Sequence, residues 1–406
     1  MHILFLSDNF PPEGNAPASR TYEHASQWVK SGQKVTVITC APNFPDGVIF
    51  NGYRNKWITK ELINGINVWR VKTYISPNKG VFKRILDFIS FMISSLIFGL
   101  FSRKIDIVIG TSPQFFTVIS GFILAKLKRV PFIFELRDFW PESVTAVGAM
   151  NDNMLIRLIE KIEMFLYKYS DHIVCVTNSF KQILIERGID KNKISVALNG
   201  VDQTLISTTP KSDLLEELDC NNDFIIGYIG THGMAHCLET IVDVAEILSD
   251  HTDIVFIFVG GGAAKDGINR YIKSKNITNI ISIGRQPKEH IDFYLKKCNI
   301  SISHLKNIDT FKNVIPSKIF ESMEGGIPML LAIPEGEATE LVVEAKSGIT
   351  AIPENPVDIA QKVLFLKENP TMLRSLSESS KISSLKYSRK EIASSILKTF
   401  HSILDK

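Results

Sequence analysis

The sequence predicts an α/β protein made of two doubly wound domains, each with a parallel sheet. The chain has 406 residues, which is more than one hydrophobic core usually organises, so two domains are expected. Short β-branched runs alternate with segments of helical apolar spacing, as they do where helices connect parallel strands. This alternation restarts after Asn199-Gly200-Val201-Asp202, so the two domains should be similar in size.

Six short runs rich in β-branched residues predict the strands of the first domain. Between them, Arg20–Ser31 and Met154–Lys168 have apolar residues at the three- and four-residue spacing of an amphipathic helix. The expected strands are His2–Ser7, Lys34–Thr39, Ile66–Val71, Ile105–Ile109, Pro131–Glu135 and His172–Val176.

The second domain follows a polar segment, Thr204–Asp213, which has the composition of a linker. We expect residues 1–203 to form the first domain, 204–387 the second, and 388–406 a C-terminal helix that crosses back to the first. Ligands of open α/β sheets bind beyond the carboxyl ends of the strands, so we expect the two domains to face a shared cleft. The expected strands are Asp223–Tyr228, Asp253–Val259, Ile280–Ile283, Asn299–Ser303 and Met329–Ala332, with a helix at Leu238–Leu248.

Composition excludes several classes of protein. The net charge of +3 is too small to indicate a nucleic-acid-binding protein. The N-terminus lacks the basic and apolar regions of a signal peptide, so we expect a cytoplasmic location. The five cysteines are scattered and form no C-x-x-C pair, which argues against a disulfide framework or a zinc site. They are Cys40, Cys175, Cys220, Cys237 and Cys298.

The loop after the first expected strand runs from Asp8 to Asn15 and contains two prolines and Gly14. A glycine just before a helix lets a ligand approach the backbone, and the amides there can bind a phosphate. An ordinary turn between a strand and a helix is the alternative interpretation.

Charged residues gather at the end of another expected strand, in Phe134–Glu142. Asp138 is a candidate to orient an acceptor hydroxyl or a sugar, and Arg137 to contact a phosphate oxygen. Glu142 is a second acid–base candidate. The alternative is an Arg–Asp pair that only closes the turn.

A third candidate loop is Ile229-Gly230-Thr231-His232-Gly233-Met234, whose small residues and free amides suit a diphosphate. It lacks the full dinucleotide-binding fingerprint. His232 and His236 have the spacing of metal ligands on a helix, but no third ligand is near in the sequence, so a metal site is not predicted.

The most informative segment is Phe311–Pro328, where a loop enters a helix that ends at Gly325-Gly326. Pro316 suits a first-turn position, Ser317 and the exposed amides can bind phosphate, and Lys318 adds positive charge. Glu321 lies about one turn further on, where a carboxylate can bind the two hydroxyls of a ribose. A capped surface helix is the alternative, but it does not explain a lone acid beside apolar residues.

These segments together resemble the family-four glycosyltransferases of the GT-B fold, which have two Rossmann-like domains. The resemblance spans nearly the whole chain. It rests on Phe10-Pro11-Pro12 with Gly14, Leu198-Asn199-Gly200-Val201-Asp202, Gly260-Gly261-Gly262, Glu321 with Gly326-Ile327-Pro328, and Gly336-Glu337-Ala338-Thr339-Glu340. Arg137–Ser143 and Pro316-Ser317-Lys318 are more narrowly similar to a subgroup that builds O-antigen and capsule, including WbuB-type L-fucosamine transferases.

The resemblance implies transfer of a sugar, such as N-acetyl-L-fucosamine or another amino or deoxy sugar, from a UDP-sugar to a polyprenyl diphosphate-linked acceptor. It implies no cofactor and no metal, since helix N-termini and cationic side chains stabilise the leaving diphosphate. The catalytic candidates are Arg137, Asp138 and Glu142. The expected donor-binding residues are Gly14, His232, Gly233, Arg285, Pro316, Ser317, Lys318, Glu321 and Glu340.

The sequence departs from the family pattern at two places. The usual Glu-x7-Glu pair would place a carboxylate at position 313, where this chain has Asn313. The basic pair that follows the Gly230–Gly233 strand in the family is also absent, so Arg285 or Lys318 is expected to neutralise the diphosphate. The stereochemistry of transfer therefore stays open.

An apolar run, Ile85–Phe101, lies between Lys83-Arg84 and Arg103-Lys104. It is about one turn short of a transmembrane span. Basic ends and an aromatic body suit a helix that docks on anionic lipid, so we expect residues 83–104 to contact the inner face of the cytoplasmic membrane. A buried crossover helix is the alternative.

Two other functions share parts of this pattern. A UDP-sugar 2-epimerase has the same two-domain architecture and a similar nucleotide site, but it has no use for the apolar helix. A non-catalytic sugar-binding protein is the other rival, although such proteins are usually exported.

Overall fold

The computed structural model describes residues 1–76, 81–140, 142, 154–201 and 223–405. It divides into two compact units, each described by itself. Unit 1 comprises Met1–Asn199 and Arg389–Lys406, and unit 2 comprises Gly200–Ser388. The expected linker Thr204–Asp213 and the expected boundary after residue 203 lie outside the described residues.

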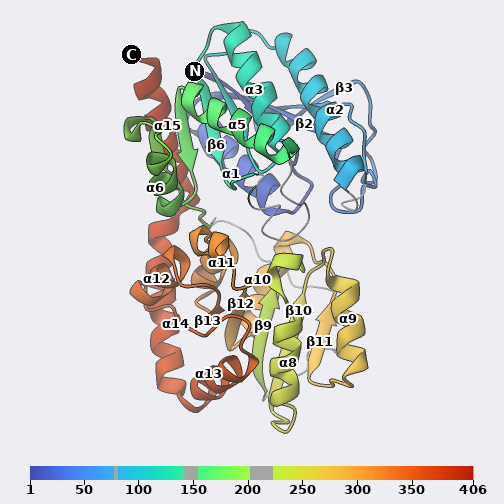
Figure 1. The fold of residues 1–406 in the computed structure, drawn as a ribbon, viewed down its shortest axis with the longest axis vertical. Coiled ribbons are helices and arrows are strands. Elements are labelled where there is room, and N and C mark those ends of the chain that lie inside the picture. The colour runs from blue at the N-terminus through green and yellow to red at the C-terminus, as the bar shows by residue number, and fades with distance from the viewer. Residues whose placement is uncertain (77–80, 141, 143–153, 202–222, 406) are drawn as a thin grey trace. The chain divides into compact units, whose positions relative to one another are not determined.

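Unit 1 is built on an eight-stranded sheet with the strand order β3-β4-β2-β1-β5-β6-β7-β8 (Figure 1). All neighbouring strands are parallel except β3 and β4. The central strands are buried along their whole length because helices cover both faces. The strands are β1 (His2–Leu6), β2 (Lys34–Cys40), β3 (Ile58–Ile63), β4 (Ile66–Val71), β5 (Ile107–Thr111), β6 (Phe132–Leu136), β7 (His172–Cys175) and β8 (Ile194–Val196).

The β3–β4 hairpin corrects the expectation of a purely parallel sheet. The two strands pair antiparallel around Asn64-Gly65, both of which have positive φ angles of 47° and 82°. Two consecutive residues with positive φ form the tight turn whose twist matches a hairpin. β3 is an edge strand with a largely exposed face, so its sequence lacks the apolar run of the buried strands.

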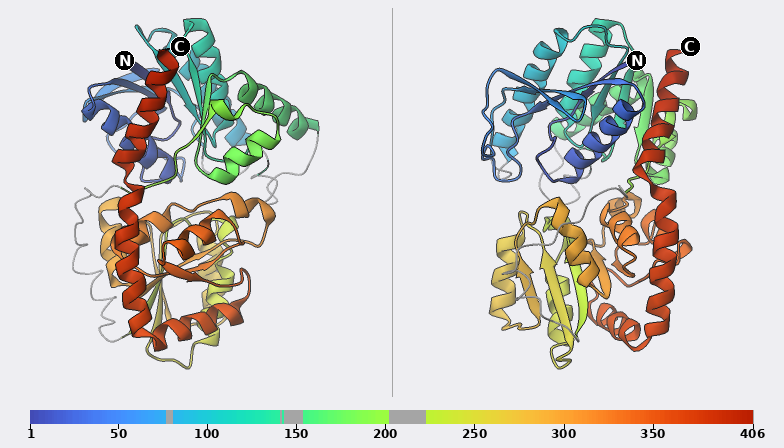
Figure 2. Two further views of the ribbon diagram at one scale, coloured as in Figure 1. Left: turned by 90° about the vertical axis from the view of Figure 1, so that its left-hand side faces the viewer. Right: turned by 180° about the vertical axis from the view of Figure 1, so that it is seen from behind.

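The helices of unit 1 lie on the two faces of its sheet (Figure 1). The C-terminal helix runs beside the first helix (Figure 2). Trp28 in the first helix donates from Nε1 to the Ala393 carbonyl over 2.9 Å and contacts the ring of Phe400. These helices are α1 (Ala16–Lys30), α2 (Val81–Leu100), α3 (Phe115–Lys128), α5 (Met154–Tyr169), α6 (Asn178–Glu186) and α15 (Arg389–Leu404).

The apolar run expected at the membrane forms α2. One face of α2 is buried against α3, where Ser95 Oγ and Ser120 Oγ lie 2.7 Å apart. Its opposite face exposes Ile93, Ile97 and Leu100, followed by Phe101. Among the described helices, none has the length and hydropathy needed to cross a bilayer.

Unit 2 has a six-stranded parallel sheet in the order β11-β10-β9-β12-β13-β14. Its core is formed by the buried faces of these strands and of the helices around them. Figure 2 shows the helices that surround the sheet. The strands are β9 (Phe224–Ile229), β10 (Ile254–Val259), β11 (Ile280–Ile283), β12 (Ile300–His304), β13 (Met329–Ala332) and β14 (Gly348–Thr350). The helices are α8 (Glu239–Ile247), α9 (Lys265–Ser274), α10 (Lys288–Lys297), α11 (Lys318–Gly325), α12 (Glu337–Glu344), α13 (Pro356–Glu368) and α14 (Pro370–Ser384).

Each sheet has one point where the strand order reverses. In unit 1 this point lies between β1 and β5, and in unit 2 it lies between β9 and β12. Loops diverge at the carboxyl edge there, which is where open α/β sheets bind their ligands. The sequence-predicted candidates follow β1 and β6 in unit 1 and β9, β11, β12 and β13 in unit 2.

Candidate active site

The ammonium group of Lys318 is the central feature of unit 2. Its Nζ is buried and has no hydrogen-bond partner among the described residues, and it lies 3.8 Å from the centroid of the Tyr228 ring. Burial lowers the pKa of Lys318 to about 7, against a smaller opposing effect of Glu321. A buried ammonium group that lies over an aromatic ring and has no hydrogen-bond partner gains much from an anionic ligand.

The turn after β9 brings the backbone close to this ammonium group. A side chain at Gly230 would come within 3.3 Å of Lys318 Nζ. Gly260, at φ 143°, packs on the same turn, and a Cβ there would lie 1.9 Å from the Gly230 carbonyl oxygen. Both glycines have a positive φ that favours glycine, and Gly260 in addition has no room for a side chain.

The start of α11 offers fewer free amides than the sequence suggests. The amide of Ile319 donates to the Pro316 carbonyl. The amides of Phe320 and Glu321 both donate to the Ser317 carbonyl. Ser317 is helical, and its side chain makes no capping hydrogen bond. Since no hydrogen bond of the described residues uses the amides of Ser317 and Lys318, these two are the ones available to an anion.

Glu321 lies three residues after Lys318, on the same face of α11. It is half-buried, and burial raises the pKa of its carboxyl, although Lys288 and Lys318 oppose the shift. A carboxyl group one turn beyond a free cation can accept hydrogen bonds from hydroxyls of a ligand whose anionic part is held at Lys318.

His232 packs differently from a typical ligand-binding histidine. It is fully buried between the rings of Tyr228 and Phe258, and neither ring nitrogen has a partner. Burial lowers the pKa of His232 to about 3, and the charges of Lys265 and Lys318 act in the same direction. The ring is therefore neutral at physiological pH and next to the site, and its role in donor binding stays a prediction.

The remaining donor candidates of unit 2 lie at the same carboxyl edge. Gly233 has ordinary negative φ and begins a short 3-10 turn (Met234–His236), and a side chain there would meet only normal contacts. Arg285 is exposed after β11, beside the turn at Gly261. Glu340 is exposed in the first turn of α12.

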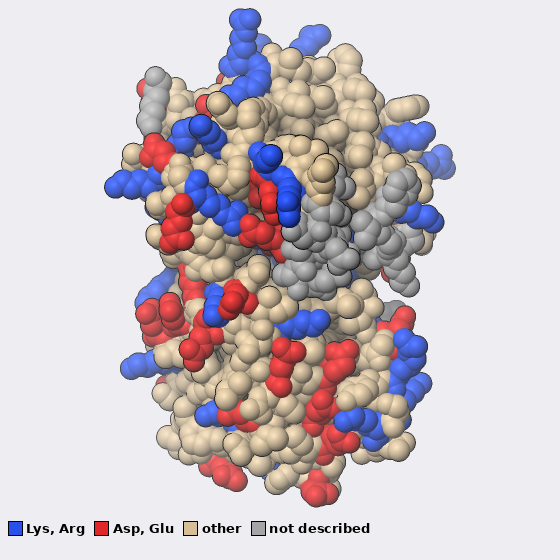
Figure 3. Space-filling model, viewed as in Figure 1, with Lys and Arg blue, Asp and Glu red and all other residues tan. Residues whose placement is uncertain are grey.

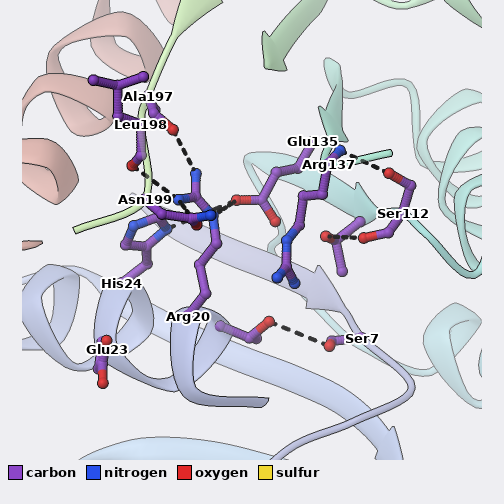
Figure 4. A network of polar contacts seen from close by, with 12 residues as sticks. Ser7, Arg20, Glu23, His24, Ser112, Glu135, Arg137, Ala197, Leu198 and Asn199 are labelled. Carbon is purple, nitrogen blue, oxygen red and sulfur yellow. Dashed lines mark hydrogen bonds and ion pairs between the residues drawn. The ribbon is translucent and has the colours of Figure 1, made fainter. Parts of the chain in front are cut away.

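Arg137 leads the candidates of unit 1 and directly follows β6. Burial lowers its pKa to about 10, so it stays charged at neutral pH, and Glu135 favours that charge. Its Nη1 is buried without a partner. The loop after β6 is held in place by Ser112, whose Oγ accepts from the Arg137 amide over 2.8 Å (Figure 4).

A buried network of ion pairs and hydrogen bonds joins Arg20 and Glu135 close to Arg137. Arg20 donates from Nε to Glu135 over 3.0 Å and from Nη2 to the Ala197 carbonyl, and it also contacts Leu198 and Asn199 (Figure 4). Although burial alone would raise the pKa of Glu135, Arg20 and neighbouring cations lower it to about 2. The network therefore ties the Leu198-Asn199 motif to the carboxyl edge of the sheet.

Asp138 and Glu142 have different surroundings. Asp138 is half-buried, and its amide donates to Ser112 Oγ over 3.3 Å. Glu142 forms an ion pair of 2.6 Å with Arg187, whose guanidinium lies over the Phe139 ring. The ion pair with Arg187 holds the Glu142 carboxylate in place, and the catalytic role of Glu142 stays a prediction.

The loop after β1 is held by Glu13 rather than by its glycine. The buried Glu13 carboxylate accepts from the amides of Phe10, Asn43 and Phe44. Gly14 is exposed, its φ is not in the left-handed region, and a side chain there would contact nothing within 4 Å. The backbone at Gly14 is accessible, but the fold does not require glycine at this position.

Two family models match the chain. Residues 18–205 match Glycosyltransferase Family 4, and residues 216–382 match Glycosyl transferases group 1. The first match covers most of unit 1 and the second most of unit 2. The chain is a glycosyltransferase of the group 1 family. This confirms the resemblance drawn from the sequence at the level of the family.

Known relatives and solved structures agree with this family. The glycosyltransferase is 24% identical over 331 residues to WcaI of Escherichia coli (strain K12), named for colanic acid biosynthesis, covering 79% of this chain and 80% of WcaI. It is 19% identical to N,N'-diacetylbacillosaminyl-diphospho-undecaprenol alpha-1,3-N-acetylgalactosaminyltransferase of Campylobacter jejuni, over 70% of this chain and 74% of that protein. Its fold matches Anabaena HepE in complex with UDP-glucose at a TM-score of 0.72 and 16% identity, over 99% and 100% of the two chains. The expected GT-B fold is thus confirmed.

Sequence reasoning missed part of the glycosyltransferase's site. Tyr228 lies inside β9, where the sequence pattern predicts an ordinary core residue. In the structure, the ammonium group of Lys318 lies over its ring. In the described part of the chain, no group of three or more His, Cys, Asp or Glu side chains is arranged to hold a metal ion.

Proposed function

We propose that this glycosyltransferase moves a sugar from a UDP-sugar to a polyprenyl diphosphate-linked sugar during O-antigen or capsule biosynthesis. The transferred sugar is an amino or deoxy sugar such as N-acetyl-L-fucosamine. Unit 2 holds the donor and unit 1 holds the acceptor. The hydroxyl oxygen of the acceptor attacks the anomeric carbon, the bond from that carbon to the diphosphate breaks, and UDP leaves with the bonding electrons. The proton of the attacking hydroxyl passes to an oxygen of the leaving diphosphate.

The observation that carries this proposal is the unpartnered ammonium group of Lys318, with Glu321 one turn further along α11. A diphosphate at Lys318 and at the amides of Ser317 and Lys318 would place the nucleoside ribose toward Glu321. Negative charge grows on the diphosphate as its bond to the sugar breaks, and a fixed cation in a dry site stabilises that charge. Lys318 and the N-terminus of α11 can supply this stabilisation without a metal.

Two relatives support the choice of donor and acceptor. HepE, which shares the fold, binds UDP-glucose. The Campylobacter relative is named for an undecaprenol diphosphate-linked acceptor. We propose that Asp138 orients the attacking hydroxyl and that Arg137 contacts the diphosphate of the acceptor, with Gly14, His232, Gly233, Arg285, Pro316 and Glu340 completing the surroundings of the donor.

The exposed face of α2 supports a location at the inner face of the cytoplasmic membrane. Ile93, Ile97, Leu100 and Phe101 are exposed together, and the surface over α2 and α3 is largely uncharged with Lys and Arg at its margins (Figure 3). Basic side chains at both ends of the helix, Lys83-Arg84 and Arg103-Lys104, are exposed and suit anionic headgroups.

A thermal-shift panel with UDP, GDP, ADP and dTDP tests the donor site. UDP should raise the unfolding temperature most, since ligand binding to the folded state stabilises it. Glu321→Ala should abolish that shift, whereas Glu337→Ala, on the neighbouring helix α12, should retain it. A Glu321→Ala protein that responds like the parent would show that the ribose is bound elsewhere.

Incubation with UDP-sugars separates a transferase from an epimerase. A transferase leaves the donor intact until a polyprenyl diphosphate-linked acceptor is added, and then releases UDP. Interconversion of the UDP-sugar without any acceptor would instead identify a 2-epimerase and overturn the proposal.

A further inference from the structure

Three adjacent strands of unit 1 end beside polar atoms that have no partner. The strands β1, β5 and β6 are neighbours in the sheet and run parallel, so their carboxyl ends lie at one edge. Asp8 follows β1, Gln114 follows β5 and Arg137 follows β6. Asp8 Oδ1, Gln114 Nε2 and Arg137 Nη1 are all buried without a hydrogen-bond partner.

Gln114 gives the clearest evidence, because the residue is only 8% exposed. It caps the N-terminus of α3, where Oε1 accepts from the amide of Thr117 over 2.8 Å and from the Thr117 hydroxyl. This use of Oε1 fixes the amide group and leaves its Nε2 donor free. A donor at the N-terminus of a fourteen-residue helix favours an anion.

Asp8 is held by its backbone rather than by its carboxyl group. Its carbonyl accepts from Thr39 Oγ1 over 2.9 Å and from Cys40 Sγ over 3.2 Å. Asn9 Nδ2 donates to Oδ2 over 3.3 Å, and Oδ1 has no partner. Burial raises the pKa of Asp8, and the nearby carboxylates of Asp87 and Glu13 raise it further, so the group suits a neutral hydroxyl better than a cation.

Arg137 supplies the second free donor. Its amide and the carbonyl of Glu135 are both tied to Ser112, which fixes the end of β6 to the end of β5. Neighbouring strands are about 4.8 Å apart, so the three strand ends span about 10 Å. That is the scale of one sugar joined to a phosphate group.

We propose that Asp8, Gln114 and Arg137 form one binding site for the sugar diphosphate head of the acceptor. Gln114 Nε2 and Arg137 Nη1 donate to diphosphate oxygens, and Asp8 Oδ1 accepts from a sugar hydroxyl. The inference rests on the proposed function and adds two residues, Asp8 and Gln114, that the sequence did not single out. The donor diphosphate has its own cation, Lys318, in the other unit.

The test is calorimetric binding of N-acetylglucosaminyl diphosphofarnesol to the full chain saturated with UDP, so that the donor site is filled. Gln114→Glu keeps the oxygen that caps α3 but replaces the free donor with an acceptor, and Asp8→Asn changes the carboxyl group without changing its size. Each should weaken binding of the probe by about tenfold or more, as expected when a buried polar contact is lost. Gln182→Glu and Asp46→Asn make the same changes at exposed positions and should leave it unchanged.

Two outcomes would overturn the inference. One is parent-like binding of the probe by both Gln114→Glu and Asp8→Asn, and the other is no binding by the parent at about 1 mM probe. The latter would mean that ordered waters alone satisfy the three atoms. UDP affinity measured on the same samples distinguishes the two failures. Absence of UDP binding would contradict the proposed function. Normal UDP binding, with probe binding that is absent or unchanged in both variants, would contradict only this acceptor site.

Discussion

The Nζ atom of Lys318 lies 3.8 Å from the centroid of the Tyr228 ring and has no hydrogen-bond partner among the described residues. Burying an ammonium group without an anion is costly, and an aromatic face offsets only part of that cost. The arrangement is therefore suited to a ligand that brings its own negative charge, as a nucleoside diphosphate does.

The free energy of unfolding should reveal this buried ammonium group through its pH dependence. The folded pKa of about 7 lies below the ordinary value of 10.5, so between these values the unfolded chain binds more protons and stability rises with pH. Lys318→Met should remove this contribution. Urea denaturation at about pH 7 and about pH 9 should show a smaller gain in the variant than in the parent. Equal gains would mean that Lys318 keeps an ordinary pKa.

Glu163 should shift stability in the opposite direction. Its buried carboxyl accepts from the Tyr167 hydroxyl over 2.7 Å and from the Trp140 amide over 3.3 Å, and burial raises its pKa to about 8. Between the ordinary value of 4.5 and about 8 the folded state holds the extra proton, so stability falls as pH rises through this window. Glu163→Gln should lose less stability than the parent between about pH 5 and about pH 8.5. A variant that loses as much would contradict the assignment.

Arg20→Met should destabilise the protein strongly. The substitution leaves the buried Glu135 carboxylate without its ion pair and removes the hydrogen bonds to residues 197–199. Breaking a buried pair in this way typically costs about 3 to 5 kcal/mol of unfolding free energy. Lys296→Ala, which breaks the exposed pair with Asp292, should change it by about 1 kcal/mol or less. Chemical denaturation of both variants measures the two losses of unfolding free energy. Similar small losses would show that the Arg20 network does not stabilise the fold.

Membrane docking should depend on the exposed face of α2. The parent should sediment with vesicles of phosphatidylcholine and phosphatidylglycerol at low salt, and high salt should weaken the association because it screens the basic flanks. Ile97→Ser combined with Phe101→Ser should reduce binding several-fold, whereas Ile247→Ser, an exposed apolar residue of α8, should not. A parent that ignores these vesicles would contradict the membrane proposal.

The fold was largely predictable because the central strands of both sheets are buried. A strand covered on both faces is mostly apolar, as β1, β9 and β10 are, and such runs stand out in the sequence. The short strands β8 and β14 have three residues each and carry no such signal. The edge strand β3 was missed although Asn64-Gly65 is a recognisable hairpin turn, because all of its residues are exposed or partly buried and it has no apolar run.

Residues of the candidate site were predictable only where a charged side chain occurs at a position that is usually apolar. Lys318 and Glu321 stand out because charged residues interrupt an apolar helix start, and Arg137 because it ends a buried strand. Tyr228 could not be found, since an aromatic residue in a central strand has the pattern of the core. Gln114 could not be predicted either, because only the structure shows that its Oε1 caps α3 while its Nε2 has no hydrogen-bond partner.

Calorimetric titration of UDP into the parent and into Lys318→Ala measures how much the Lys318 ammonium group contributes to binding of the diphosphate. Lys265→Ala is the matched control, because Lys265 lies in the same unit but donates its ammonium protons to Ser282 and Ile283. We expect Lys318→Ala to weaken UDP binding by about a hundredfold, equivalent to about 2.7 kcal/mol, and Lys265→Ala to bind UDP like the parent. Unchanged UDP affinity in a folded Lys318→Ala protein would show that the diphosphate is held elsewhere.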